Sequence, residues 1–199
     1  MPIYQHAKGN NMMSIDSIPN WMTVLRIVVT PVIAIMIWID DASYGYLVAF
    51  ILFTIASITD YLDGMLARQM KIESGFGEML DPIADKMLIG AVLLALASVQ
   101  TSGWVFLVPA LLILSREFMI SGLREYLAKI SFAVPVTRLA KWKTTVQILA
   151  LGTLIGAPAF PSLIYAHDIG LMLLWVAALL TLQTGMGYIV AGLRQVPNK

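Results

Sequence analysis

The sequence predicts an all-α integral membrane protein with six transmembrane helices, and three observations support this prediction. The 199 residues are 59% hydrophobic and only 13% charged, and their mean hydropathy is +0.81, outside the range of ordinary soluble domains. Six apolar segments each approach the roughly 20 residues that a helix needs to cross a hydrocarbon core. Polar, glycine or proline linkers separate these segments. We therefore expect one membrane domain at 16–199, preceded by an N-terminal tail at 1–15.

The six segments follow one another with clear breaks. Residues 40–43 end the first, 100–103 end the third, and the proline-containing stretch 157–161 ends the fifth. Trp21, Trp38, Trp104 and Trp142 lie near segment ends, where aromatic side chains suit the membrane interface. The predicted spans are 21–39, 44–67, 79–99, 104–127, 139–157 and 169–193.

The basic residues are distributed unevenly across these spans. The linkers after the first, third and fifth segments contain no Lys or Arg, so all 13 lie on the opposite side or in the helix halves nearest to it. Because cytoplasmic loops carry the excess of Lys and Arg, both termini are predicted to be cytoplasmic. The N-terminus has no continuous apolar run typical of a cleavable signal.

Four aspartates, Asp60, Asp63, Asp81 and Asp85, lie at the cytoplasmic ends of the second and third segments. Residues three or four apart share a helix face, so each pair should converge. The short link predicts that the two helices are antiparallel neighbours and that the pairs face each other. Four carboxylates in a partly dry site need cations. Oxygen ligands with no nearby His, in a chain without cysteine, favour two Mg²⁺ or Mn²⁺ ions.

Small and cationic residues lie between the aspartates. Gly64 and Gly77 leave room for a ligand to approach the backbone, and Ala67 is small. Arg68 offers a fork of donors that suits a phosphate oxygen. This set fits a nucleotide diphosphate bridged by metal.

The full spacing is Asp-x2-Asp-Gly-x2-Ala-Arg-x8-Gly-x3-Asp-x3-Asp, from Asp60 to Asp85. It resembles the signature of the CDP-alcohol phosphatidyltransferases, with every position filled. The stretches 18–31, 116–125 and 141–145 are similar to the bacterial phosphatidylglycerophosphate synthase branch of that family. The resemblance covers most of the chain.

The resemblance implies a six-helix membrane fold, commonly a homodimer, in which an alcohol attacks metal-bound CDP-diacylglycerol and CMP departs. Glycerol 3-phosphate would be the acceptor through its sn-1 hydroxyl, and phosphatidylglycerophosphate the product. By this resemblance the metal ligands would be Asp60, Asp63, Asp81 and Asp85, with Asp85 also the base. The contacts to CDP-diacylglycerol would be Asn20, Thr23, Gly64, Ala67, Arg68, Ser74 and Gly77.

Cations further along the chain could bind the acceptor phosphate. Arg116 lies about 12 residues, or roughly 18 Å, inside the fourth segment, and a charge at that depth needs an anion. Glu117 and a substrate phosphate are both candidates. Arg124, Lys141 and Lys143 lie nearer the cytoplasmic surface, where they could bind acceptor or attract anionic lipids. Lys141 and Lys143 lie about 200° apart on a helix, so only one is expected to point into a cavity.

Two alternatives to this function remain at the sequence level. One is an enzyme of the same family that uses inositol phosphate, serine or phosphatidylglycerol as acceptor. The other is a cation-binding membrane transporter, although the outer helix halves are too apolar to suggest a through-path. We expect membrane lipids as neighbours, no nucleic-acid partner and a multi-pass location in a bacterial inner membrane.

Overall fold

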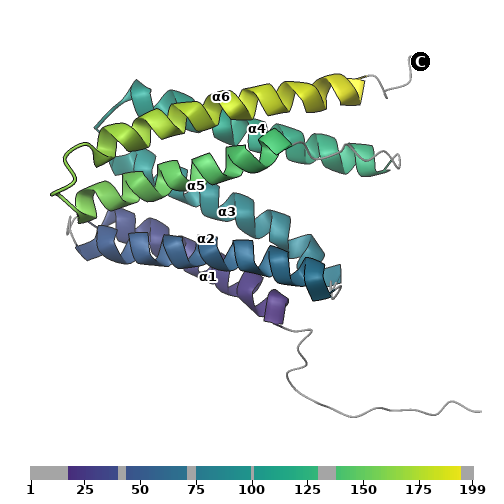
Figure 1. Ribbon diagram of the computed structural model, residues 1–199, viewed down its shortest axis with the longest axis horizontal. Helices are drawn as coiled ribbons and strands as arrows, with labels where there is room; N and C mark the ends of the chain where they lie inside the picture. The colour runs from purple at the N-terminus through teal and green to yellow at the C-terminus, as the bar shows by residue number, and fades with distance from the viewer. Residues whose placement is uncertain (1–17, 40–43, 71–74, 100, 130–137, 194–199) are drawn as a thin grey trace, which may run out of the picture.

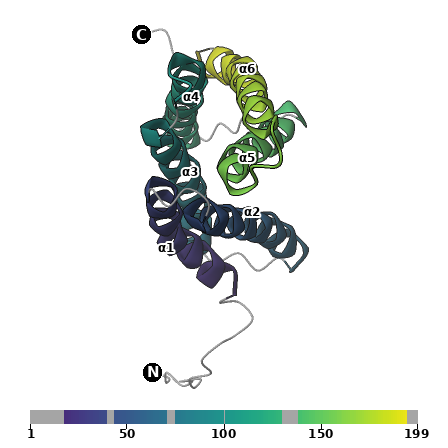
Figure 2. The same cartoon turned by 90° about the vertical axis from the view of Figure 1, so that its left-hand side faces the viewer.

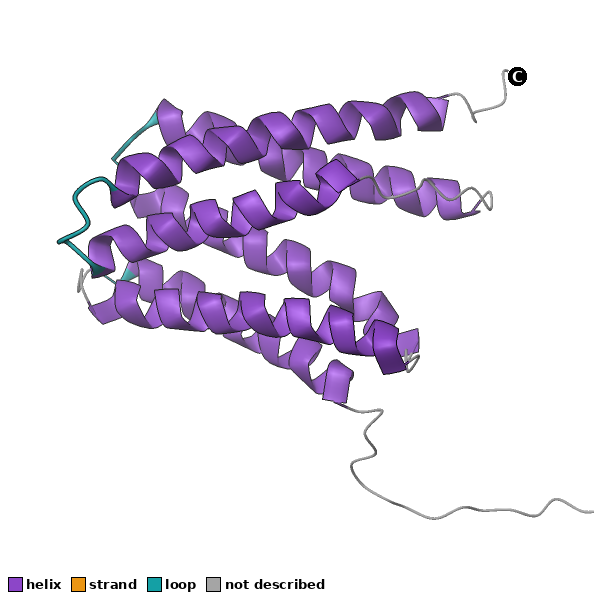
Figure 3. Ribbon diagram, viewed as in Figure 1, coloured by secondary structure: helices purple, strands orange, loops and turns teal. Residues whose placement is uncertain are grey.

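The computed structural model consists of six α-helices in the part of the chain that it describes, residues 18–39, 44–70, 75–99, 101–129 and 138–193 (Figures 1 and 3). Side chains are described at 21–39, 44–62, 79–99, 101–127, 139 and 142–189. Every predicted apolar segment is confirmed as a helix. The helices are α1 (Ile18–Trp38), α2 (Tyr44–Met70), α3 (Gly75–Val99), α4 (Trp104–Lys129), α5 (Arg138–Ala159) and α6 (Ala166–Leu193).

Five of these helices, α1, α2, α3, α4 and α6, are long and apolar enough to cross a membrane. Large apolar side chains such as Leu94, Ile164 and Met186 point outward on the isolated chain, and such residues suit a lipid environment. The helix α5 is the least apolar of the six, because its first half contains Lys143 and Gln147. Both of these side chains are buried, so α5 turns its polar face toward the protein interior.

The helices pack as two groups of three (Figures 1 and 2). In the first group α1 packs along both α2 and α3, and in the second α6 packs along both α4 and α5. The main contact between the groups is made by α2 and α5, and α3 adds smaller contacts with α4 and α5. Fully buried side chains of both groups form one core, among them Ile33, Phe53, Leu96, Leu154 and Leu174.

The expectation that α2 and α3 pack directly against each other is wrong for the described residues. These two helices make little or no direct contact, and each packs on α1 instead. A short link between two helices favours an antiparallel arrangement, but it does not prevent a third helix from lying between them. The aspartates of α2 and α3 are therefore brought together across α1.

A close helix crossing and two side-chain hydrogen bonds hold α4, α5 and α6 together. A Cβ added at Gly170 would lie 2.8 Å from Leu154 Cγ and 3.2 Å from Leu154 N, so only glycine fits this crossing of α5 and α6. At the end of the bundle away from the aspartates, Trp175 Nε1 donates to the carbonyl oxygen of Val105 at 2.9 Å. Ser102 Oγ and His167 Nε2 are also hydrogen-bonded there, at 2.8 Å.

Candidate functional site

A buried arginine of α1 lies among the aspartates of α2 and α3. Arg26 Nη1 is 2.7 Å from Asp60 Oδ1, 2.6 Å from Asp85 Oδ1 and 3.9 Å from Asp81 Oδ1. The Arg26 side chain is only 1% exposed. One turn earlier, Thr23 Oγ1 donates a hydrogen bond of 2.8 Å to Asp81 Oδ1. The helix α1 therefore supplies both a charge and a hydroxyl that position the carboxylates.

Sequence reasoning missed this role of Arg26, which was considered only among the basic residues that set the topology. A signal was present, because a basic residue in an apolar span needs an anionic partner. Thr23 was predicted to contact CDP-diacylglycerol. The structure places it beside the aspartates, where its hydroxyl is already donated to Asp81.

The carboxylate cluster fits a hard divalent cation in its chemistry. The Arg26 guanidinium stands where three carboxylates converge, so its Nη1 marks a point at which they stabilise positive charge. The three carboxylates outnumber the one guanidinium among them, and a divalent cation such as Mg²⁺ or Mn²⁺ would offset the excess negative charge. The carboxylate ligands are all oxygen, as these ions prefer. Among the described side chains, no group of three or more acidic or His residues is arranged to hold a metal ion, so the metal-ligand roles of Asp60, Asp81 and Asp85 stay predictions.

A cavity of about 450 Å³ opens beside these aspartates and extends between α3, α4, α5 and α6. It brings together residues that lie far apart in the chain. Asp81 and Asp85 line it from α3, and three of the predicted acceptor-binding residues, Arg116, Arg124 and Lys143, line it from α4 and α5. The other lining residues are Pro82, Lys86, Ile89, Glu117, Ile120, Thr144, Gln147 and Tyr188.

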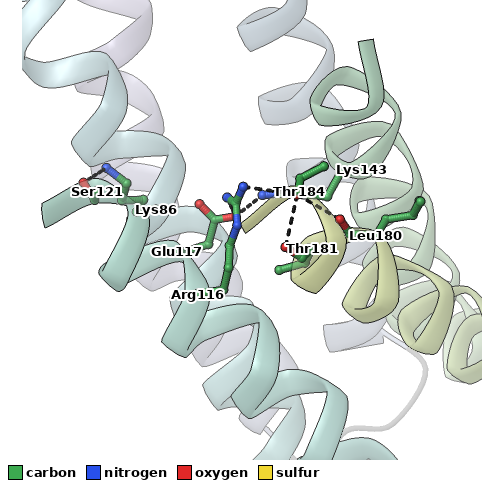
Figure 4. Close-up of polar contacts among 8 residues, drawn as sticks. All are labelled: Lys86, Arg116, Glu117, Ser121, Lys143, Leu180, Thr181 and Thr184. Atoms are coloured by element: carbon green, nitrogen blue, oxygen red, sulfur yellow. Dashed lines mark hydrogen bonds and ion pairs between the residues drawn. The ribbon is translucent and has the colours of Figure 1, made fainter. Parts of the chain in front are cut away.

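Glu117 links the two buried cations of this cavity (Figure 4). Arg116 Nη1 lies 3.4 Å from Glu117 Oε1, and the same oxygen accepts a hydrogen bond from Lys143 Nζ. Arg116 and Lys143 are 8% and 7% exposed, whereas Glu117 is 21% exposed. Glu117 is thus the internal anion that the depth of Arg116 requires. Two cations share one carboxylate, so one positive charge in this group remains available to a bound anion.

The helix α6 holds Arg116 from its other side. Arg116 Nη2 donates to Thr184 Oγ1 at 3.2 Å, and the Arg116 Cζ lies 6.0 Å from the centre of the Tyr188 ring. A Cβ at Gly185 would lie 3.2 Å from Arg116 Cγ, so this glycine makes room for the arginine. Arg116 is therefore fixed by contacts with α6 and with Glu117 of its own helix rather than left to rotate in the cavity.

Another cation of the cavity, Lys86, directly follows Asp85 in the chain. Its Nζ donates to Ser121 Oγ of α4 at 2.5 Å, which joins α3 to α4 (Figure 4). Sequence reasoning considered Lys86 only as a topology charge. Its position beside Asp85 adds positive charge to the wall that carries the carboxylates.

Several predicted site residues lie outside the described side chains, so the structure neither supports nor contradicts their roles. Lys141 is among them, and only Lys143 of that pair is seen to line the cavity. The roles of the described residues also stay predictions, because the structure gives their positions alone. The predicted residues outside the described side chains are Asn20, Asp63, Gly64, Ala67, Arg68, Ser74, Gly77 and Lys141.

Comparison with known proteins gives one family and one enzyme name among the relatives. Residues 16–183 match the family model of the CDP-alcohol phosphatidyltransferases. A protein of Rickettsia felis is 46% identical over 180 residues, which cover 90% of this chain and 97% of the relative. Proteins of Cereibacter sphaeroides and Haemophilus influenzae are each 36% identical, with 86% and 87% of this chain covered and 93% and 91% of the relatives. Each of these relatives is named CDP-diacylglycerol--glycerol-3-phosphate 3-phosphatidyltransferase.

Proposed function

Because this chain belongs to the CDP-alcohol phosphatidyltransferase family, we propose that it transfers the phosphatidyl group of CDP-diacylglycerol to the sn-1 hydroxyl of glycerol 3-phosphate. The products are phosphatidylglycerophosphate and CMP, which makes the chain an enzyme of phospholipid biosynthesis. The observation that carries the proposal is that Asp81 and Asp85 line the same cavity as Arg116 and Lys143. A reaction between a pyrophosphate lipid and a phosphorylated alcohol needs both kinds of group.

The carboxylates prepare the donor side of the reaction. Bound Mg²⁺ or Mn²⁺ would hold the pyrophosphate and offset the negative charge that develops as the bond to CMP breaks. Asp60, Asp81 and Asp85 would hold these ions, together with Asp63 as the resemblance implies. Arg26 keeps the Asp60 and Asp85 carboxylates at a common point, and Thr23 fixes Asp81. The nucleotide part would contact Asn20, Gly64, Ala67, Arg68, Ser74 and Gly77.

The acceptor reacts at the Asp85 end of the cavity. The sn-1 oxygen attacks the lipid-bearing phosphorus, the bond from that phosphorus to the CMP oxygen breaks, and CMP leaves with the electron pair. Asp85 takes the proton that the hydroxyl loses. Asp85 is 51% exposed in its side chain, so a ligand in the cavity can reach it.

The cations of α4 and α5 suit the acceptor phosphate. Arg116 and Lys143 are buried, and the pair carries one more positive charge than Glu117 neutralises. A phosphate placed there would receive charge-assisted hydrogen bonds from both. Arg124 lines the same cavity, and Lys141 lies two residues before Lys143 in the chain.

The same family uses other alcohols, which gives the second candidate function, an enzyme for inositol phosphate, serine or phosphatidylglycerol. Serine carries no phosphate and would leave the buried cations without a ligand. The names of the relatives and the buried cations together favour glycerol 3-phosphate. A transporter has no support in the family match or in the names of the relatives.

The membrane arrangement belongs to this proposal as well. We expect α5 to cross the membrane as well, which would bring the number of spans to six. Both termini and the cavity should face the cytoplasm, and the protein should lie in the bacterial inner membrane. The excess of Lys and Arg at the aspartate side and the bacterial origin of the relatives support this arrangement. A homodimer is expected from the family resemblance.

The test is CMP release from CDP-diacylglycerol by the detergent-purified protein, with glycerol 3-phosphate, inositol phosphate, serine and phosphatidylglycerol compared as acceptors. We expect release with glycerol 3-phosphate alone, loss of release in EDTA, and recovery with Mg²⁺ or Mn²⁺. Binding of Mn²⁺, followed by its paramagnetic resonance signal, tests the metal site without turnover. Release with another acceptor alone would overturn the choice of acceptor, and full activity in EDTA would overturn the metal requirement.

A further inference from the structure

One buried polar group in the cavity has no role in the reaction as described so far. Gln147 of α5 is 3% exposed and lines the cavity. Among the described residues its Oε1 has no hydrogen-bond partner. Buried side-chain oxygens are nearly always hydrogen-bonded, because leaving one unpaired loses the interaction with water and gains nothing in return. Such a group next to a ligand cavity indicates that its partner is the ligand.

The other uncharged polar side chains that line the cavity are Tyr188 and Thr144. Tyr188 presents its ring to the Arg116 guanidinium. Thr144 has an interaction within the protein. Of the three, Gln147 is the one with a fully buried side-chain oxygen that has no hydrogen-bond partner among the described residues.

Gln147 lies on α5 one helical turn beyond Lys143, which is proposed to bind the acceptor phosphate. Gln147 follows Lys143 by four residues, so the two side chains share one helix face about 6 Å apart along the axis. Lys143 lies with Arg116 at the cationic side of the cavity, whereas Asp85 lines it from α3. An acceptor that spans the cavity would have its phosphate at the cations and its reacting hydroxyl at Asp85. Its remaining polar group then needs a partner on the α5 wall.

We propose that Gln147 determines acceptor specificity by accepting a hydrogen bond from the hydroxyl of the acceptor that does not react. The ligand class is a short phosphorylated polyol with one free hydroxyl between its phosphate and its reacting end. For glycerol 3-phosphate this group is the sn-2 hydroxyl, so the inference rests on the proposed function. Gln147 selects the acceptor, and it takes no part in proton transfer.

The test compares two acceptors that differ by this hydroxyl alone, glycerol 3-phosphate and 3-hydroxypropyl phosphate. We expect the unaltered enzyme to favour glycerol 3-phosphate by about 10- to 100-fold in kcat/KM, the range for one hydrogen bond to a buried group. Gln147→Met replaces the amide by an apolar chain of similar length. It should lower kcat/KM for glycerol 3-phosphate by the same factor and change kcat/KM for the analogue by less than about twofold, so that the preference disappears.

A matched control is Gln183→Met, because Gln183 is exposed on α6. It should leave the preference unchanged. Equal losses of kcat/KM for both acceptors in Gln147→Met would indicate a structural role and overturn the inference. A Gln147→Met enzyme that still prefers glycerol 3-phosphate would also overturn it, and so would an unaltered enzyme that shows no preference between the two acceptors. If Gln147→Met does not fold, Gln147→Glu serves as the second variant, because it keeps an accepting oxygen. This variant should still prefer glycerol 3-phosphate over the analogue, even where kcat/KM falls for both. Loss of the preference in Gln147→Glu would overturn the inference. An unaltered enzyme that uses another alcohol and not glycerol 3-phosphate would instead overturn the proposed function.

Discussion

Arg26 of α1 donates a 2.6 Å hydrogen bond to Asp85 of α3, the residue proposed as the base. The arginine is almost fully buried, whereas the aspartate side chain is half exposed. The carboxylate is therefore held from the protein side and remains accessible from the cavity. The same Arg26 nitrogen lies 2.7 Å from Asp60 of α2, so one side chain joins the carboxylates of two helices that make little contact themselves.

We expect Arg26→Met to destabilise the metal-free protein by about 2 kcal/mol, because it removes charge-assisted hydrogen bonds and leaves neighbouring carboxylates to repel one another. Thermal unfolding in detergent with EDTA measures the effect. Mg²⁺ should restore part of the lost stability, since a divalent ion replaces the missing positive charge. An unchanged unfolding temperature in EDTA would show that the ion pairs do not stabilise the protein.

Asp85→Asn is expected to lower the rate of CMP release by about 10²- to 10⁴-fold, the usual contribution of a positioned general base. The substitution keeps the size of the side chain, and the half-exposed position should tolerate it. Size-exclusion chromatography and helical circular dichroism serve as the folding controls. A rate within about twofold of the unaltered enzyme would show that Asp85 is not the base.

Lys143→Met should raise the KM for glycerol 3-phosphate by about 10- to 100-fold and have little effect on kcat, because the lysine is proposed to bind a phosphate that does not react. The apolar chain of methionine preserves the packing of the buried lysine stem. Steady-state kinetics at saturating CDP-diacylglycerol separates the two constants. If kcat alone fell, Lys143 would act in the chemical step instead.

Glu117→Gln is expected to lower the KM for glycerol 3-phosphate by about fivefold, because Glu117 pairs with Arg116 and Lys143 and would compete with the phosphate proposed to bind them. The same kinetic assay tests this expectation, and Glu125→Gln on the same helix provides a comparison. A higher KM would instead mean that Glu117 is needed to hold the two cations in place.

Gly170→Ala should destabilise the protein by about 1–3 kcal/mol, because the new Cβ would lie 2.8 Å from Leu154 Cγ at the α5–α6 crossing. Gly187→Ala, on the same helix, meets nothing within 4 Å and should be neutral or slightly stabilising. Thermal unfolding of both variants measures the difference. Equal unfolding temperatures would show that α5 and α6 can separate slightly without cost.

The apolar runs predicted the helices well, because the length needed to cross a membrane constrains each segment strongly. Arg116, Arg124 and Lys143 were predicted to bind the acceptor phosphate, and all three line one cavity together with Asp81 and Asp85. The insertion of α1 between α2 and α3 was not predictable in the same way. Loop length constrains only neighbours in sequence, whereas this contact depends on packing among three helices.

Arg26 and Gln147 were missed for a related reason. Arg26 is an isolated polar residue in an apolar run and Gln147 follows several polar residues, but the significance of each depends on groups contributed by other helices. The partners of Arg26 follow it by 34 and 59 positions in the chain. Gln147 is distinctive only because its oxygen is buried without a partner in the described structure, and burial and pairing cannot be read from one sequence.

The packing of the six helices in two groups of three has a consequence for how the enzyme could change during evolution. The aspartates of the site that the structure describes and Arg26, which holds them, come from α1 to α3, whereas Arg116, Glu117 and Lys143 come from α4 and α5. The first half of the chain can therefore keep one nucleotide-activated donor while substitutions in the second half adapt the pocket to a new alcohol. Exchange of α4 to α6 between relatives of different acceptor preference would transfer that preference with the exchanged helices.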